Sequence, residues 1–371
     1  MKFIGNKFRL LNFIESVTRD NNINHGVFMD VFAGTANVGK HFKKLGFKII
    51  STDTLDFSYV FQRAYIKVSE YPKFENLKLP DIKLPKESLF DFKKEKTEKE
   101  RRVERLKKVI FFLNNLKGEK GFIYNNYCED GTKNKKYKRR FFSDSNAMRI
   151  DAIRNCIQKW KDNGEISEDE FYILLAELID RSDYVANNSG TYGAYLKIWR
   201  SMALKPLILN MPTIIESDKK HEVFKIDANE LVKIRSCDIA YIDPPYNARQ
   251  YAANYHVLET IACWDNPKIY GKTGMRPHKD KDSTYSLKSS APKVFGELIN
   301  NLKCKHILMS YNNEGIIPQE NIIEILKNKG AFKLYEKKYR RFRSESDHEN
   351  RKYKVPGDKT TEYVYYCGVK K

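Results

Sequence analysis

The sequence predicts an α/β fold, and two stretches near its start carry the prediction. A short apolar stretch at 27–32 has the composition of a strand and runs into the small-residue segment 33–39, after which a helical pattern follows. A second strand-like stretch at 47–52 ends at Asp53. The order of strand, loop, helix, strand and acid is typical of a nucleotide-binding sheet, in which ligands bind beyond the carboxyl ends of the strands.

The second half of the chain returns to strand-like patterns. Strands are expected at 223–226, 239–242, 306–310, 332–339 and 362–367. Residues 266–292 are polar and show no clear period. A loop of that length in a compact fold is usually functional or disordered.

Residues 73–214 are expected to form a mainly helical insertion. Residues 93–108 are almost all charged, which favours an exposed helix with alternating signs. In the stretch 141–214, Ile150, Ile153 and Ile157 recur at helical spacing. The catalytic part of the chain would then be divided between residues 1–72 and 215–371.

The charge balance points to a polyanionic partner. The 371 residues carry a net charge of +20, and 13% of them are aromatic. Lysine and arginine that neutralise phosphates release condensed counterions, and bases stack on tyrosine. The alternative explanation of the charge is a basic protein from a lysine-rich proteome.

Membrane, metal and disulfide functions find no support in the sequence. No run of 18 apolar residues is present, and residues 1–10 lack the apolar core of a signal peptide. The six cysteines form neither a C-x-x-C pair nor a cluster with metal-ligand spacing. We therefore expect free thiols, no metal and a cytoplasmic protein.

The strongest chemical signal is the tetrapeptide Asp243-Pro244-Pro245-Tyr246, which directly follows the apolar stretch 239–242. The amine of adenine is a poor nucleophile because its lone pair is delocalised into the ring. A carboxylate at Asp243 and the carbonyl of Pro244 can accept its two hydrogens and localise the lone pair, while Tyr246 stacks on the base. The alternative is a proline-stiffened surface turn.

Two further stretches suit a cofactor. In 30–37 a small-residue loop between strand and helix lets backbone amides approach a ligand, and Asp53 can accept both hydroxyls of a ribose. The loop fits neither G-x-G-x-x-G nor G-x-x-x-x-G-K-[ST]. Lys7, beside Gly5, can hold a carboxylate, although a surface lysine is the simpler reading.

Taken together, these motifs make the sequence resemble the Dam-like class of DNA adenine-N6 methyltransferases over most of its length. Residues 3–7 are similar to that class's Y-I-G-S-K element, 30–34 to its cofactor loop and 243–246 to its catalytic tetrapeptide. Residues 122–127, 188–197 and 310–312 are also similar to this class. Ala36, where many members have a second glycine, and Asn6, in place of serine, depart from the pattern.

The resemblance implies a Rossmann-like seven-stranded sheet that binds S-adenosylmethionine, with an inserted target-recognition region. It also implies an adenine that is flipped out of double-stranded DNA. The residues expected to bind the cofactor are Lys7, Asp30, Phe32, Ala33, Gly34, Asp53 and Asp227. The candidates for DNA contact are Arg139, Arg140, Tyr192, Lys197, Arg249 and Tyr251.

The resemblance further implies the modification enzyme of a restriction-modification system, with a restriction endonuclease encoded nearby as a partner. Two other readings stay open. One is methylation of the cytosine amine or of RNA, because the tetrapeptide suits any amine conjugated to a heterocycle. The other is a catalytically silent nucleic-acid-binding relative, against which the intact tetrapeptide argues.

Overall fold

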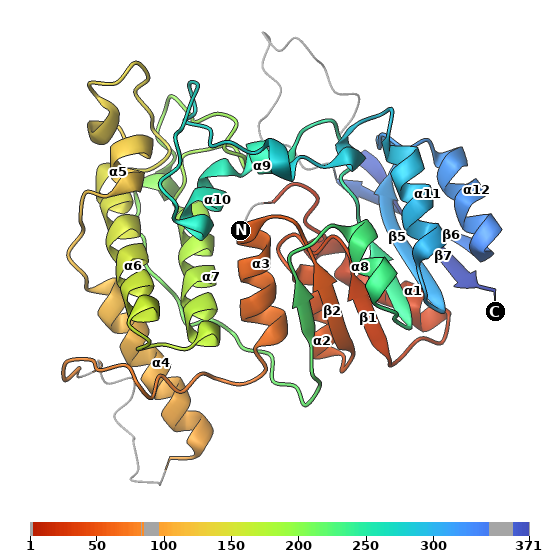
Figure 1. Ribbon diagram of the computed structural model, residues 1–371, viewed down its shortest axis with the longest axis horizontal. Coiled ribbons are helices and arrows are strands. Elements are labelled where there is room, and N and C mark those ends of the chain that lie inside the picture. The colour runs from red at the N-terminus through yellow and green to blue at the C-terminus, as the bar shows by residue number, and fades with distance from the viewer. Residues whose placement is uncertain (1–2, 83, 85–95, 341–358, 371) are drawn as a thin grey trace.

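A sheet and a cluster of helices lie side by side in the computed structural model, which describes residues 3–82, 84, 96–340 and 359–370 (Figure 1). The described sheet has seven strands in the order β3-β2-β1-β4-β5-β7-β6. The strands are β1 (Val27–Asp30), β2 (Lys48–Thr52), β3 (Glu222–Phe224), β4 (Ile239–Ile242), β5 (His306–Asn312), β6 (Gly330–Arg340) and β7 (Lys359–Val369). All seven were predicted, with ends that differ by a few residues.

The pairing of the strands decides which of their ends meet. Strands β1 to β5 pair in parallel, and β7 lies antiparallel between β5 and β6. The chain order reverses at the β1–β4 pair, where the ends of both strands open toward ligands. Because β7 is antiparallel, its first residues lie at the same edge as the last residues of β4 and β5.

Helices cover both faces of the sheet, which explains its continuous apolar strands. In Figure 1, α8 (Ala228–Ile234), α11 (Ala291–Asn301) and α12 (Gln319–Lys329) lie in front of it, with α1 (Leu11–Asp20) and α2 (Asn37–Lys44) behind. Successive side chains of β1 point to opposite faces: Phe28 belongs to one hydrophobic cluster and Met29 to the other.

The helical side contains the predicted insertion, together with segments on either side of it (Figure 1). Its helices are α3 (Asp56–Gln62), a π-helix (Arg63–Lys67), α4 (Glu98–Asn114), α5 (Phe122–Tyr127), α6 (Asp144–Asp162), α7 (Glu168–Tyr184), α9 (Tyr251–Asn254) and α10 (His256–Cys263). Short 3₁₀ turns complete the described helices at Phe8–Leu10, Asp130–Thr132, Ser201–Leu204, Lys279–Lys281 and Thr284–Ser286.

Side-chain caps begin the long helices of the insertion. Thr97 and Glu100 form a capping box at α4, and Ser167 and Glu170 form one at α7. The helix predicted at 93–108 therefore begins at Glu98, while residues 93–95 lie outside the described part. Ser143 caps α6, and its side chain accepts the backbone N–H of Asn146.

The insertion shares its core with the catalytic part of the chain. One hydrophobic cluster contains Phe28 of β1, Ile150 of α6 and Leu174 of α7. The buried guanidinium of Arg154 on α6 also donates to the carbonyls of Ile261 and Ala262 at the end of α10. The two parts are thus joined through a continuous core.

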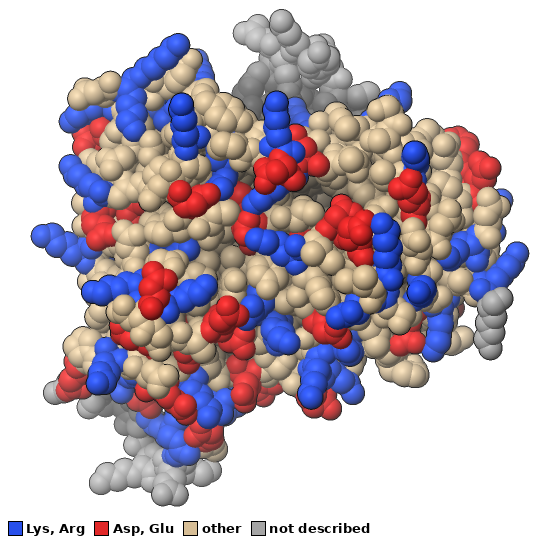
Figure 2. All heavy atoms as spheres, in the orientation of Figure 1, with Lys and Arg blue, Asp and Glu red and all other residues tan. Residues whose placement is uncertain are grey.

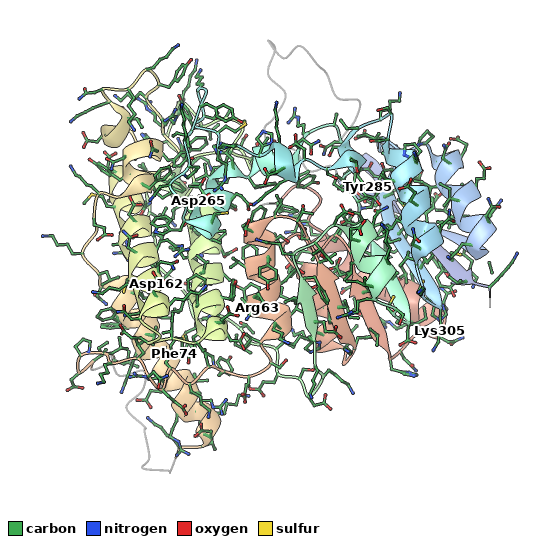
Figure 3. The ribbon with its side chains drawn as sticks, viewed as in Figure 1. Arg63, Phe74, Asp162, Asp265, Tyr285 and Lys305 are labelled. Atoms are coloured by element: carbon green, nitrogen blue, oxygen red, sulfur yellow. The ribbon has the colours of Figure 1, made fainter. Side chains whose placement is uncertain are left out.

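The long polar stretch 266–292 is ordered in the structure. A short β-bridge joins Tyr270 to Met275. Arg276 forms an ion pair with Asp265, at 2.7 Å between Nη2 and Oδ2; Asp265 is labelled in Figure 3. Among the described helices, none is both long and apolar enough to cross a membrane.

Ala36 provides a test of the cofactor-loop geometry. It is buried at the start of α2 with φ 57° and ψ 21°, in the left-handed region that favours glycine. We expect Ala36→Gly to raise the free energy of unfolding by up to about 1 kcal/mol, because the left-handed strain disappears. Denaturant unfolding measures the change.

A β-branched residue at the same position is the matched control. Ala36→Val should lower the free energy of unfolding by about 1–2 kcal/mol or more, because valine tolerates this conformation poorly. Equal stability of the two variants would contradict the left-handed assignment.

Candidate active site

A cavity of about 250 Å³ opens at the carboxyl edge of the parallel strands. Three loops that are far apart in the sequence meet there: the one after β1, the one after β2, and the tetrapeptide after β4. The cavity is lined by several residues that were predicted to bind the cofactor, act in catalysis or contact DNA: Phe32, Gly34, Asp53, Asp227, Asp243, Tyr246 and Tyr251. Lys7, Asp30, Ala33 and Pro244, which were also predicted, are not among the lining residues.

The loop after β1 is held by the acid that ends β2. Gly34 has φ +50°, and its backbone N–H donates to Asp53 Oδ2 at 2.9 Å. Leu55 N–H donates to Asp53 Oδ1 at 3.1 Å, and the Ser58 hydroxyl donates to the Gly34 carbonyl at 2.6 Å. Burial raises the pKa of Asp53, and these backbone donors oppose the increase. The carboxylate is thereby fixed at the wall of the cavity.

Asp30 and Ala33 support this loop from behind. The N–H of Ala33 donates to the carbonyl of Thr52 at 3.0 Å, which ties the loop to β2. Asp30 is only 1% exposed. Burial, followed by the nearby carboxylate of Asp243, raises its pKa to about 8. Both residues act within the protein and do not face the cavity.

The side chain of Asp243, at the end of β4, is 13% exposed and lies beside the ammonium of Lys7. Lys7 Nζ lies 3.2 Å from Asp243 Oδ1 and 3.6 Å from Glu362 Oε2. Burial raises the pKa of Asp243 to about 6, and Lys7 opposes the increase. Lys7 therefore contacts the tetrapeptide 243–246. From the sequence it was expected to hold the carboxylate of a cofactor.

Tyr246 forms an aromatic wall of the cavity. Its ring packs edge-on against Tyr311 of β5, with 5.7 Å between centroids, and Lys7 Nζ lies 5.0 Å from its centroid. Gly5 allows the chain to pass this close. Its φ is +78°, and a Cβ there would lie 3.1 Å from the Tyr246 hydroxyl oxygen. The ring is thus held in a defined place beside Asp243.

Phe3 and Tyr255 form an aromatic pair beside this wall. Phe3 lines the cavity and stacks on Tyr255 with 4.8 Å between centroids. The Tyr255 hydroxyl accepts the N–H of Ile4 at 2.7 Å. Phe3 had no role assigned from the sequence, although it stands in the same motif as Gly5 and Lys7.

The loop at 279–284 closes one side of the cavity, and the residues that fix it were also missed. Gln250 donates to the Ser283 carbonyl at 3.1 Å and accepts the Ser283 N–H at 2.7 Å. Lys281 pairs with Asp56 and with Glu259, which is 1% exposed. Just beyond the loop, Tyr285 packs edge-on against Phe32 at 5.0 Å; it is labelled in Figure 3.

One group of possible metal ligands occurs among the described residues. Ligand atoms of Asp56, Glu259 and Cys263 lie within 4.8 Å of one another. The ammonium groups of Lys281 and Lys225 already pair with these carboxylates. The cluster therefore serves as an anchor for the loop at 279–284.

Two of the six candidates for DNA contact are buried, and the prediction is corrected for both. Arg139 is 6% exposed and donates to the carbonyls of Asn126, Gly271 and Lys272. Tyr192 is fully buried and its hydroxyl bonds to Asp183 at 3.3 Å. Both side chains stabilise the fold through these hydrogen bonds. A basic or aromatic run in the sequence does not show whether its side chains are buried or exposed.

The other four candidates remain accessible to different degrees. Lys197 and Arg249 are exposed. Arg140 is half-buried and forms an ion pair with Glu129, and Tyr251 faces the cavity. On the face shown in Figure 2, cations and anions are interspersed. The charges on that face therefore do not by themselves indicate where a polyanion would bind.

Comparison with known proteins agrees with this geometry. A model of the family described as D12 class N6 adenine-specific DNA methyltransferase matches residues 3–325. Type II methyltransferase M.NlaIII of Neisseria lactamica is 37% identical, over 98% of this chain and 98% of its own.

Two longer relatives are about as similar. Type II methyltransferase M.FokI of Planomicrobium okeanokoites is 39% identical over 99% of this chain and 52% of its own. Modification methylase LlaI of Lactococcus lactis subsp. lactis is 35% identical over 99% and 54%. The chain thus spans about half the length of these two. The match over most of the chain and the geometry of the cavity agree, and the chain belongs to the D12 class of N6 adenine-specific DNA methyltransferases.

Proposed function

We propose that this protein transfers a methyl group from S-adenosylmethionine to the N6 amine of an adenine flipped out of double-stranded DNA, at a specific site. The observation that carries the proposal is the position of Asp243. Its carboxylate shares one cavity with the Gly34–Asp53 pair and with the ring of Tyr246. Donor and acceptor of the methyl group can therefore meet there.

The charge of the cavity fits this cofactor, which supplies a methyl group on a sulfonium ion. Its lining includes the acids Asp53, Asp227, Asp243, Asp280 and Asp282. The single lining lysine, Lys281, already pairs with Asp56 and Glu259. An acidic wall suits a ligand that carries a sulfonium and an ammonium group.

Within the cavity, we assign Asp53 to the ribose, Phe32 and Gly34 to the methionine part and Asp227 to the adenine of the cofactor. Asp53 Oδ1 and Oδ2 each accept one backbone N–H, and a carboxylate oxygen can accept a further bond. Asp227 uses Oδ1 to cap α8. Asp30 and Ala33 would shape this site from behind.

The chemistry at the amine follows from the acceptors of the tetrapeptide. The Asp243 carboxylate and the Pro244 carbonyl would each accept one amine hydrogen, so that the nitrogen lone pair points at the methyl carbon. As the new C–N bond forms, the bond from methyl carbon to sulfur breaks and its electron pair stays on sulfur. The nitrogen then releases one proton, for which Asp243 is the nearest carboxylate. Tyr246 would hold the ring of the base.

Target recognition is assigned to residues 73–214, and residues 1–72 with 215–371 form the catalytic part. Arg140, Lys197 and Arg249 are the accessible cations that we propose as DNA contacts, and Tyr251 lies where a flipped base would enter. The relatives are named as modification methylases and Type II methyltransferases. We therefore place the protein in a restriction-modification system of the cytoplasm, with a cognate endonuclease as partner.

The proposed function is tested by mapping its product. The protein is incubated with labelled S-adenosylmethionine and unmodified genomic DNA, and single-molecule sequencing locates the modified bases. N6-methyladenine in one sequence context supports the proposal. Methylcytosine, label in RNA alone or no transfer would contradict it.

Asp243→Ala separates catalysis from binding. We expect it to abolish methyl transfer, because the amine loses one of its two acceptors. DNA affinity should stay within about 1 kcal/mol of wild type, since phosphate contacts dominate binding. Transfer assays and fluorescence anisotropy with the same duplex measure both; unchanged turnover would refute the role of Asp243.

Exposed and buried cations should behave differently toward DNA. Lys197→Ala and Arg249→Ala should each weaken binding and lower the slope of log affinity against log salt by about one. Binding titrations at several salt concentrations measure this slope.

Arg139→Met is the matched buried control. It should lower the free energy of unfolding by about 2 kcal/mol or more, because three partly buried hydrogen bonds to backbone carbonyls lose their charged donor. The salt slope should not change once the protein is folded. A reduced slope without a loss of stability would place Arg139 on the DNA.

A further inference from the structure

We propose that Lys7 and Glu362 are positioning residues that set the charge state of Asp243, with Lys7 acting on the carboxylate directly and Glu362 acting through Lys7. The inference deepens the proposed function and rests on it. It assigns a role to Glu362, which no motif of the sequence marked, and gives Lys7 a role apart from the cofactor.

The topology of the sheet explains how Glu362 reaches the site. Acids at the ends of parallel strands gather at the carboxyl edge, and Asp243 is one of them. Glu362 stands near the start of β7, which runs antiparallel, so it lies at the same edge. In the register of the sheet it is opposite Asn312, near the end of β5. Glu362 is 6% exposed.

The three side chains form a buried cluster with one cation and two carboxylates. Lys7 is 4% exposed, and its ammonium lies 3.2 Å from Asp243 Oδ1 and 3.6 Å from Glu362 Oε2. Apart from this ammonium, no group in the described part of the chain donates a hydrogen bond to either oxygen. Each carboxylate thus depends on a cation that the other also attracts.

Sharing the cation suits the chemistry expected of Asp243. Without Lys7, the buried carboxyl group would be protonated more readily, and the neutral group is a weaker acceptor for the amine hydrogen. If Lys7 paired with Asp243 alone, it would compete with the amine for the oxygen. Glu362 draws the ammonium partly away, so Asp243 stays both charged and available.

The effects of the two neighbours on Asp243 have opposite signs. Burial raises the pKa of Asp243 to about 6, Lys7 lowers it and Glu362 raises it. The pKa of Lys7 is lowered by burial, but Asp243, Tyr246 and Glu362 outweigh burial and hold it well above its usual value. Removing Glu362 should therefore lower the pKa of Asp243, and removing Lys7 should raise it.

Other titratable groups near Asp243 come from β1, β4, β5, α9 and the tetrapeptide. They are Asp30, Tyr241, Tyr311, Tyr251 and Tyr246. Burial raises the pKa of each of these tyrosines, so they stay neutral near pH 6. Asp30, with a pKa of about 8, is a second group that titrates in the working range.

The test is the pH dependence of single-turnover methyl transfer by the full chain, at saturating cofactor and DNA. The rate should fall as the pH drops through the pKa of Asp243, because the neutral carboxyl group is a weaker acceptor for the amine hydrogen and cannot take up the released proton. The midpoint should move to lower pH in Glu362→Gln and to higher pH in Lys7→Met, each by roughly one unit. Glu362→Asp, which keeps the charge, should stay near wild type.

Two further variants serve as controls. Glu324→Gln removes an exposed acid on α12 and should leave the midpoint unchanged. Asp30→Asn tests whether the fall in rate at low pH comes from Asp243 or from Asp30. In the Asp30→Asn background, the midpoint of Glu362→Gln should still lie at lower pH than the midpoint of Lys7→Met. Thermal unfolding and cofactor affinity confirm that each variant is folded and loaded.

The outcomes are separable. The rates of the two variants could fall while their midpoints stay unchanged or both shift in the same direction. Either result would show that Lys7 and Glu362 only support the structure. If Glu362→Gln does not fold, Lys7→Met decides alone: an upward shift supports the proposal, and no shift or a downward one overturns it. A wild-type protein that methylates no adenine would instead contradict the proposed function.

Discussion

The carboxylate of Asp243 has to be buried and charged at the same time, and much of the site follows from this requirement. Burial beside a binding cavity favours the protonated form, which is a weaker acceptor for an amine hydrogen than the carboxylate. The ammonium of Lys7 lies 3.2 Å from this carboxylate and is also attracted by Glu362. The segment at 3–7, the tetrapeptide after β4 and the start of β7 therefore have to meet at one edge of the sheet.

Two glycines let the backbone approach side chains closely enough for these segments to meet. Gly5 and Gly34 both have positive φ, and a Cβ on either would press on an aromatic ring, that of Tyr246 or of Phe3. The same edge carries Asp53, which fixes the Gly34 loop. The parts that would hold a methyl donor and its acceptor are thus joined by backbone contacts, before any ligand binds.

The sequence predicted the strands well because strands depend on local pattern. Strand β4 is a short apolar run that ends at an acid, and this pattern is visible without a structure. Arg139 and Tyr192 were wrongly placed on the DNA, because a charged or aromatic residue reads the same whether it is exposed or fixed inside. Glu362 and Glu259 were missed because their partners are distant in the chain. The antiparallel direction of β7 brings Glu362 close to Lys7, and the packing of α10 brings Glu259 close to Lys281.

A crystal structure with S-adenosylhomocysteine and duplex DNA that contains the methylated site tests the central claim most directly. The account predicts an extruded adenine whose N6 lies within hydrogen-bond distance of both the Asp243 carboxylate and the Pro244 carbonyl. Its ring should pack on Tyr246, and the thioether sulfur should lie beside the Gly34 loop. A base held elsewhere, or a cofactor outside the cavity between Gly34 and Asp243, would contradict it.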